Sequence, residues 1–132
     1  MSQQNKDLVR AYVDAFNRAD LDALCNLFTA DALIWGVFGW GDLKTVRPLW
    51  KELMECLKPN LQVEAIIAEA DTVAARYVER GTAARAFRGK QATGRSYELT
   101  AMEWFVIQDG LIHRRWGARD SASLAKQLGW DT

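Results

Sequence analysis

The sequence contains few of the residues that build a metal centre or a disulfide framework. It has one histidine and two cysteines, Cys25 and Cys56. The cysteines lack Cys-x-x-Cys spacing and fall in different predicted helices, which favours reduced, buried thiols. A multi-histidine metal site is excluded, and no pattern indicates another kind of metal site.

An excess of charge of one sign and long apolar runs are missing as well. Lys plus Arg equals 17 and Asp plus Glu equals 17, so no basic excess attracts the phosphates of nucleic acid. No stretch approaches the roughly 20 apolar residues that span a bilayer, and the first residues lead into a charged amphipathic segment rather than a signal peptide. We therefore expect a cytoplasmic protein that binds neither nucleic acid nor membrane.

The chain has the size and composition of one hydrophobic core. It has 132 residues, 49% of them apolar, and no repeat, linker or low-complexity segment divides it. We predict a single domain over residues 1–132.

The first half of the chain has mainly helical periodicity. Apolar residues recur at helical spacing over residues 5–17, and Asp20 is typical of the N-cap of a short second helix. A third helix is predicted over residues 46–58, with Pro48 in its first turn or at a kink because proline lacks an amide donor.

The second half has the patterning of long strands. A short strand at 32–35 is followed by a glycine-rich stretch, 36–41, that predicts a loop. Longer strands joined as an antiparallel meander are predicted at 61–69, 72–83, 96–107 and 111–119. Asp120 or Ser121 can cap a last helix that Gly129 ends.

Helices followed by a meander are typical of the α+β class. We predict a cone-shaped α+β barrel in which N-terminal helices pack on a curved antiparallel sheet and a short C-terminal helix follows. The open end of such a cone forms a natural pocket for a small molecule.

Alternation along the last strand places Asp120, Trp116 and Arg114 on one face, the predicted pocket face, and His113 on the other. A carboxylate among tryptophans has a raised pKa and is suited to proton exchange near neutral pH. Asp120 is therefore a candidate general acid/base, and the alternative is that it only caps the last helix.

Two glutamates interrupt otherwise apolar rows on the neighbouring strands. Glu103 is either a second pocket acid or a charge at the open end of the sheet. Glu79 shares a face with Tyr77, and both are predicted to border the pocket. Because an unpaired buried charge is costly, we hypothesise that Glu79 pairs with Arg114 inside the cone.

Six tryptophans are many for this length. Trp35, Trp40 and Trp116 fall near the predicted mouth or pocket face, where flat rings would suit a flat, hydrophobic, possibly polycyclic ligand. The alternative for each tryptophan is packing in the core.

The ordered set of short motifs resembles the SnoaL-like polyketide cyclases, within the nuclear transport factor 2-like superfamily. The likeness covers nearly the whole chain. The segments that carry it are 15–20 (AFNRAD), 28–32 (FTADA), 68–77 (AEADTVAARY), 81–82 (GT), 89–94 (GKQATG), 109–112 (DGLI), Trp116, Asp120 and 127–129 (QLG).

The resemblance implies a cone-shaped barrel that forms a homodimer through the outer face of its sheet and uses no metal or cofactor. Cyclases of this family close a ring by intramolecular aldol condensation, with one pocket aspartate as general acid/base. By position in the Trp-x-x-x-Asp segment, that residue would be Asp120. Ala83 and Arg114 depart from the histidine and glutamate that the family often has there.

The sequence leaves three alternative functions for this protein. The first is a cofactor-independent enzyme that moves a proton on a hydrophobic cyclic carbonyl compound, with Asp120 and Glu103 as catalytic candidates. The second is a non-catalytic protein of the same fold that binds a small molecule or serves as a dimeric scaffold. The third is an epoxide hydrolase-like or isomerase-like enzyme, although the arginine that the epoxide hydrolases use is missing from the segment 101–103.

Overall fold

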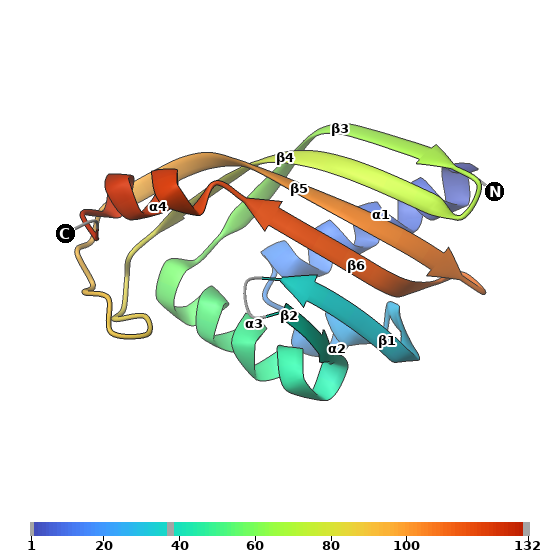
Figure 1. The fold of residues 1–132 in the computed structure, drawn as a ribbon, viewed down its shortest axis with the longest axis horizontal. Helices are drawn as coiled ribbons and strands as arrows, with labels where there is room; N and C mark the ends of the chain where they lie inside the picture. Colours follow the sequence, from blue (N-terminus) through green and yellow to red (C-terminus); the bar gives the residue numbers. More distant parts are fainter. Residues whose placement is uncertain (1, 37–38, 131–132) are drawn as a thin grey trace.

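The computed structural model describes residues 2–36 and 39–130. Three helices lie on one face of a curved sheet, and a fourth lies at its end beside the long β4–β5 connection (Figure 1). The helices are α1 (Ser2–Asn17), α2 (Leu21–Cys25), α3 (Leu43–Leu57) and α4 (Ser121–Leu128). The predicted α+β class, with helices packed on a curved sheet, is confirmed.

The sheet has six strands in the order β2-β1-β6-β5-β4-β3. Their bounds are β1 (Phe28–Gly36), β2 (Gly39–Asp42), β3 (Asn60–Glu69), β4 (Thr72–Thr82), β5 (Ser96–Gln108) and β6 (Leu111–Arg119). The meander from β3 to β6 is antiparallel throughout, as the sequence predicts. The pair of β1 with β6 is parallel, so the prediction of an entirely antiparallel sheet is wrong at this one pair.

Two tight turns set the register of the meander. The β5–β6 turn consists of Asp109 and Gly110, with φ of 53° and 76°, and Ala70 in the β3–β4 turn has φ of 53°. Positive φ in a two-residue connection matches the right-handed twist of the strands that it joins.

The glycine-rich stretch differs from the predicted loop. Residues 39–42 form β2, an edge strand paired with β1, in which Trp40 lies opposite Trp35; residues 37 and 38 lie outside the described residues. Glycine weakens an isolated strand, so it is the pairing with β1, together with the contact of the two indoles, that makes this segment a strand.

The third helix begins earlier than predicted. The Asp42 carboxylate accepts a hydrogen bond from the Thr45 amide at 2.9 Å, which caps α3 at its N-terminus. Pro48 therefore lies inside the helix rather than in its first turn.

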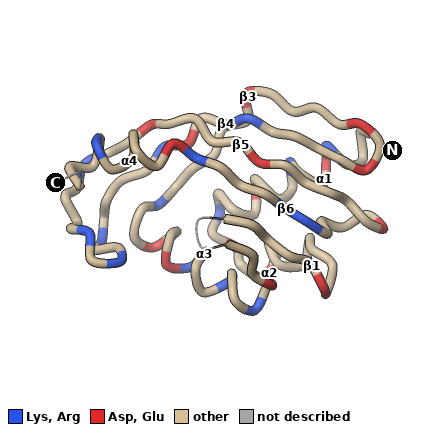
Figure 2. The backbone as a smooth tube through the Cα atoms, in the orientation of Figure 1, with Lys and Arg blue, Asp and Glu red and all other residues tan. Residues whose placement is uncertain are grey.

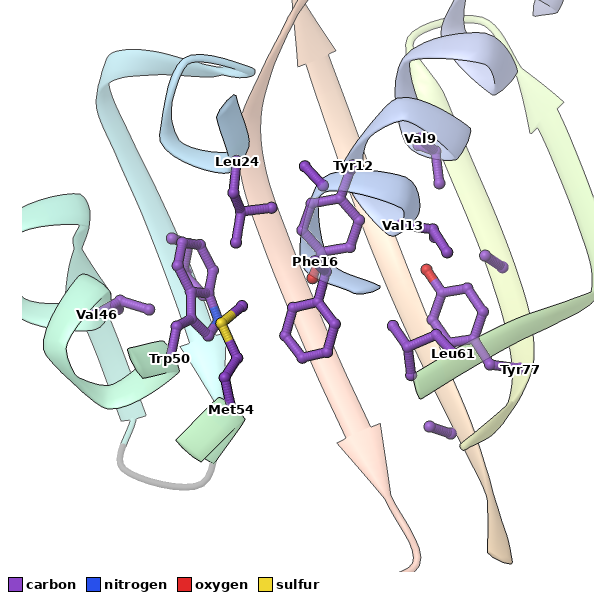
Figure 3. Packing of buried hydrophobic residues seen from close by; sticks show 14 of the residues in the cluster. Val9, Tyr12, Val13, Phe16, Leu24, Val46, Trp50, Met54, Leu61 and Tyr77 are labelled. Atoms are coloured by element: carbon purple, nitrogen blue, oxygen red, sulfur yellow. The ribbon is translucent and has the colours of Figure 1, made fainter. Parts of the chain in front are cut away.

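The core fills the space between the helices and the inner face of the sheet (Figure 3). Tyr12 of α1 is 1% exposed, and its ring packs edge-on against Phe105 of β5 at 5.1 Å and Phe28 of β1 at 6.0 Å. Helix α1 is thus held against the middle of the sheet by an aromatic cluster. None of the helices in the described part of the chain has the length and hydrophobicity of a transmembrane span.

Charged residues of both signs are spread over most of the fold (Figure 2). The connection between β4 and β5 is the exception, because residues 83–95 contain four basic residues, Arg85, Arg88, Lys90 and Arg95, and no acidic one. Arg88 forms a salt bridge with Glu52 of α3 at 2.7 Å, which ties this connection to the helices.

Gly81 lets the end of α3 approach the sheet. A Cβ atom at this position would meet the Leu57 carbonyl oxygen and would lie 2.6 Å from the Tyr97 ring. We predict that Gly81→Ala lowers the free energy of unfolding by about 1–3 kcal/mol through overpacking, as measured by urea denaturation. Gly36→Ala is the matched control, because its Cβ would approach no atom closer than 3.9 Å; equal losses would contradict the prediction.

Candidate functional site

A cavity of about 710 Å³ lies between the inner face of the sheet, α1, α3 and α4. Most of its wall is apolar, with Phe16, Ile34, Trp50 and Leu124 among the lining residues. Residues 87, 88 and 90 of the β4–β5 connection border it together with Trp130, whose ring stacks on Phe87 at 6.4 Å. A cavity of this size and lining suits a drug-sized hydrophobic molecule.

The cavity wall contains a carboxylate, Glu103 of β5, held by three donors from three other elements. Its Oε1 accepts from the Tyr77 hydroxyl of β4 at 2.9 Å, and its Oε2 accepts from the Tyr12 hydroxyl of α1 at 2.9 Å. Oε2 also accepts from Arg115 Nη1 of β6. The side chains of Glu103 and Arg115 are 10% and 11% exposed, so this ion pair is largely withdrawn from water.

The two tyrosines act as donors only. Burial, followed by the negative charge of Glu103, raises the pKa of both Tyr12 and Tyr77 far above the usual tyrosine value. Both hydroxyls therefore keep their protons near neutral pH and can donate to the carboxylate.

A second paired carboxylate lies farther along the same inner face. Glu79 of β4 is 4% exposed and accepts a hydrogen bond from the Tyr97 hydroxyl at 2.6 Å. Its two oxygens also accept from Nε and Nη2 of Arg119, a side-on, bidentate pair of bonds between guanidinium and carboxylate. Two glutamate–arginine pairs thus border the cavity.

A β-bulge decides which residues of β6 face the cavity. Val106 of β5 lies opposite Arg114, and the next residue, Ile107, lies opposite Ile112. His113 is therefore the extra residue of β6, and its ring lies against β1, with Nδ1 3.0 Å from the Thr29 hydroxyl. An extra residue reverses the inward and outward alternation beyond it.

Because of this bulge, the predicted pocket face of β6 is wrong for the residues that follow His113. Arg115, Gly117 and Arg119 line the cavity, whereas Arg114 and Trp116 lie on the outer side. The hypothesised pair of Glu79 with Arg114 is wrong: Glu79 pairs with Arg119, and Arg114 donates to the main-chain oxygens of residues 31 and 113. The predicted inner faces of β4 and β5, with Tyr77, Glu79 and Glu103, are confirmed by their burial and by the cavity lining.

Asp120 lies outside the cavity lining. It is exposed, and its carboxylate accepts a hydrogen bond from the Ser123 amide at 3.0 Å, so it is the N-cap of α4. The placement of Asp120 on the pocket face is therefore wrong, because this residue follows the end of β6 and its carboxylate is directed to the first turn of α4. Its catalytic role stays a prediction.

The three tryptophans predicted to bind ligand lie together. Trp40 packs edge-on against Trp35 at 5.5 Å and against Trp116 at 5.2 Å. The cluster lies over the outer side of the sheet, and of the three only Trp35 also borders the cavity. Their role in ligand binding stays a prediction.

The model of the SnoaL-like domain matches residues 9–115. The chain belongs to the SnoaL-like family. The matched range includes Tyr12, Tyr77, Glu103 and Arg115, and it ends before α4 and its cap. Comparison with curated proteins finds no match.

Solved structures agree with this assignment of the SnoaL-like domain. IdmH from Streptomyces antibioticus, a candidate polyketide cyclase, is 28% identical over 96% of this chain and 99% of its own, with a TM-score of 0.84. A candidate polyketide cyclase from Silicibacter sp. TM1040 is 27% identical over 96% of both chains, with a TM-score of 0.88. AclR from Streptomyces galilaeus, a candidate hydroxylase, shares the fold at 24% identity over 100% of this chain and 89% of its own, with a TM-score of 0.90.

Sequence reasoning missed Tyr12, Arg115 and Arg119 as parts of the site. The useful signal was the presence of two carboxylates in apolar rows, because each buried carboxylate requires a cation. Strict strand alternation, which takes no account of the bulge at His113, predicted Arg114 as the cation instead of Arg119.

The observed pairing makes a prediction for stability. In a double-mutant cycle, Glu79→Gln and Arg119→Gln should show a coupling of about 0.5–3 kcal/mol, because the two side chains share hydrogen bonds inside the cavity. The control cycle pairs Glu79→Gln with Arg114→Gln, and the two losses should add within about 0.5 kcal/mol. Chemical denaturation of the variants measures both cycles, and coupling in the control alone would contradict the structure.

Proposed function

We propose that this SnoaL-like domain is an enzyme that moves a proton on a hydrophobic, cyclic carbonyl compound, as in an aldol cyclisation or an isomerisation. The observation that supports this function is the carboxylate of Glu103 in the wall of an apolar cavity, among donors from Tyr12, Tyr77 and Arg115. The resemblance of the domain to candidate polyketide cyclases supports the same class of chemistry.

In this proposal Glu103 is the general base. Its carboxylate, placed among three donors, can accept a proton from a substrate carbon. Within the described part of the chain, Oε1 accepts one hydrogen bond, from Tyr77, whereas a carboxylate oxygen has two lone-pair positions. The remaining position of Oε1 is where a proton from the substrate carbon would be received. Asp120 is the second candidate, and it would require a movement of the start of α4.

The substrate would be held mainly by apolar contact. The wall formed by Phe16, Ile34, Trp50 and Leu124 excludes water from the reacting carbon, and an enolate formed there would be protected from protonation by solvent. Trp35, at the border of the cavity, would contact one edge of a flat ring system.

One observation favours the alternative of a non-catalytic binding protein. Each cavity carboxylate is already paired with an arginine, Glu79 with Arg119 and Glu103 with Arg115. Pairs of this kind need no catalytic role, because each arginine neutralises the charge of a glutamate that borders a binding cavity. The experiment below separates this function from proton transfer.

We also propose a cytoplasmic homodimer formed through the outer face of the sheet. The large hydrophobic side chains found to be exposed, Trp35, Trp40, Ile67, Met102 and Trp104, all lie on strands of this sheet. The β-sheet register places them on its outer side, and Trp104 and Met102 are 52% and 53% exposed at its centre. An apolar patch of this kind is typical of a protein–protein interface.

Deuterium exchange tests the proposed chemistry. In D₂O, the protein should accelerate exchange at the α-carbons of 2-tetralone, a bicyclic ketone, over the buffer rate. Glu103→Gln should reduce this acceleration by about 10²–10⁴-fold, the usual contribution of a general base. The exchange is followed by NMR or mass spectrometry.

Two variants serve as controls for the exchange. Glu98→Gln removes an exposed carboxylate of the same strand, and Asp120→Asn keeps a good helix cap; both should retain the wild-type rate. Loss of exchange in Asp120→Asn alone would make Asp120 the base. A protein that binds the ketone without accelerating exchange would support the binding function instead.

The homodimer is tested by Trp104→Glu. A charge at the centre of the apolar patch should raise the dimer dissociation constant at least about tenfold, which is a loss of about 1.4 kcal/mol, as measured by analytical ultracentrifugation. Glu55→Gln, at an exposed position of α3 on the opposite side of the sheet, is the control. A monomeric wild-type protein would contradict this proposal.

A further inference from the structure

Arg115 uses little of its hydrogen-bonding capacity. A guanidinium group has five N–H donors, and the only hydrogen bond of this one among the described residues runs from Nη1 to Glu103. Its Nε is buried without a partner among those residues. Nη2 also makes no hydrogen bond with the described residues, so its N–H groups are available to an oxygen acceptor.

Two glycines leave the guanidinium uncovered by side chains. A Cβ at Gly117 would meet Nη1 and would lie 3.2 Å from Cζ, and a Cβ at Gly36 would lie 3.9 Å from Nη2. Both glycines line the cavity. Arg115 is 9% exposed. Its Nε is covered by protein atoms, so Nη2, beside the cavity-lining Gly36, is the donor that an oxygen in the cavity can reach. An unpaired donor in an apolar space is costly, and a ligand oxygen would remove that cost.

We infer that Arg115 binds the carbonyl oxygen of the substrate. During the reaction, the negative charge beside Arg115 then passes from Glu103 to that oxygen. This inference rests on the proposed function and narrows the substrate class to carbonyl compounds that form an enolate. The oxygen accepts from Nη2, and the adjacent C–H bond points to Oε1 of Glu103.

The charges balance at this step. The C–H bond breaks, and its proton forms an O–H bond with Glu103. The electron pair of the C–H bond becomes the new C=C bond, and the π pair of the carbonyl group moves to its oxygen. Glu103 becomes neutral while the oxygen becomes negative, so Arg115 loses one anionic partner and gains another. The net charge of the cavity does not change, which matters because a new unpaired charge in an apolar environment would be strongly unfavourable.

The test uses 4-nitrophenol, whose ionised form carries the oxygen charge of an enolate and absorbs visible light. In Glu103→Gln, which resembles the protonated carboxyl group, Arg115 lacks its anionic partner and should bind the phenolate. The pKa of the bound phenol should be lower than in the wild type by at least about one unit, a tenfold preference for the anion. Spectroscopic titration of the bound phenol measures this difference.

The double variant Glu103→Gln/Arg115→Gln should lose the preference, whereas Glu103→Gln/Arg114→Gln should keep it. If the former does not fold, Glu103→Gln/Gly36→Ala replaces it, because a methyl group beside Nη2 should weaken phenolate binding several-fold without removing the arginine. Retention of the preference without Arg115, or its absence in Glu103→Gln, would overturn the inference.

The outcome is distinguishable from that of the proposed function. Phenolate binding requires no proton abstraction from carbon, so it tests Arg115 alone, and ketone exchange tests Glu103. Exchange that depends on Glu103 without phenolate binding at Arg115 would leave the proposed function in place and reject the inference.

Discussion

The ion pair of Glu103 with Arg115 is the interaction on which the site depends. It joins neighbouring strands, β5 and β6, and the tyrosines that bond to the same carboxylate add β4 and α1. Removal of either charge would leave the other buried and uncompensated, a condition that typically costs several kcal/mol. The shape of the cavity and the position of the candidate base are therefore maintained by the same hydrogen bonds.

The bulge at His113 makes this pairing possible. Without the extra residue, strict alternation would place Arg114 and Trp116 inside and would send Arg115 outward. With it, Arg115 and Arg119 reach the two glutamates, and Trp116 joins the tryptophans on the outer side. A single backbone irregularity thus separates a polar set of residues within the cavity from an aromatic set outside it.

The apolar wall determines what these charges can do. In an environment with little water, an unpaired charge is strongly disfavoured, whereas a transfer of charge between two positions beside one cation is tolerated. Two tyrosine hydroxyls that keep their protons add fixed dipoles to the site without adding charge. These properties are compatible with the proton transfer proposed for this domain, in which the total charge of the cavity does not change.

The fold class and most element positions follow from the sequence alone. Helical and strand periodicities are local properties, and the turns at 70–71 and 109–110 carry their own backbone preferences. The SnoaL-like family was recognisable for the same reason, because its ordered short motifs mark the turns and strand entries. The glutamates at 79 and 103 were likewise visible as charges in apolar rows.

Only the tertiary structure decided which partners those glutamates have. Strand alternation is a count along the chain, and one bulge shifts every later residue to the other face. The bulge arises from strand pairing, on one side with β5 across the 109–110 hairpin and on the other side with β1, which is distant in sequence. The sequence by itself therefore determined that buried carboxylates require cations, and strand pairing in the folded sheet determined that Arg115 and Arg119 supply them.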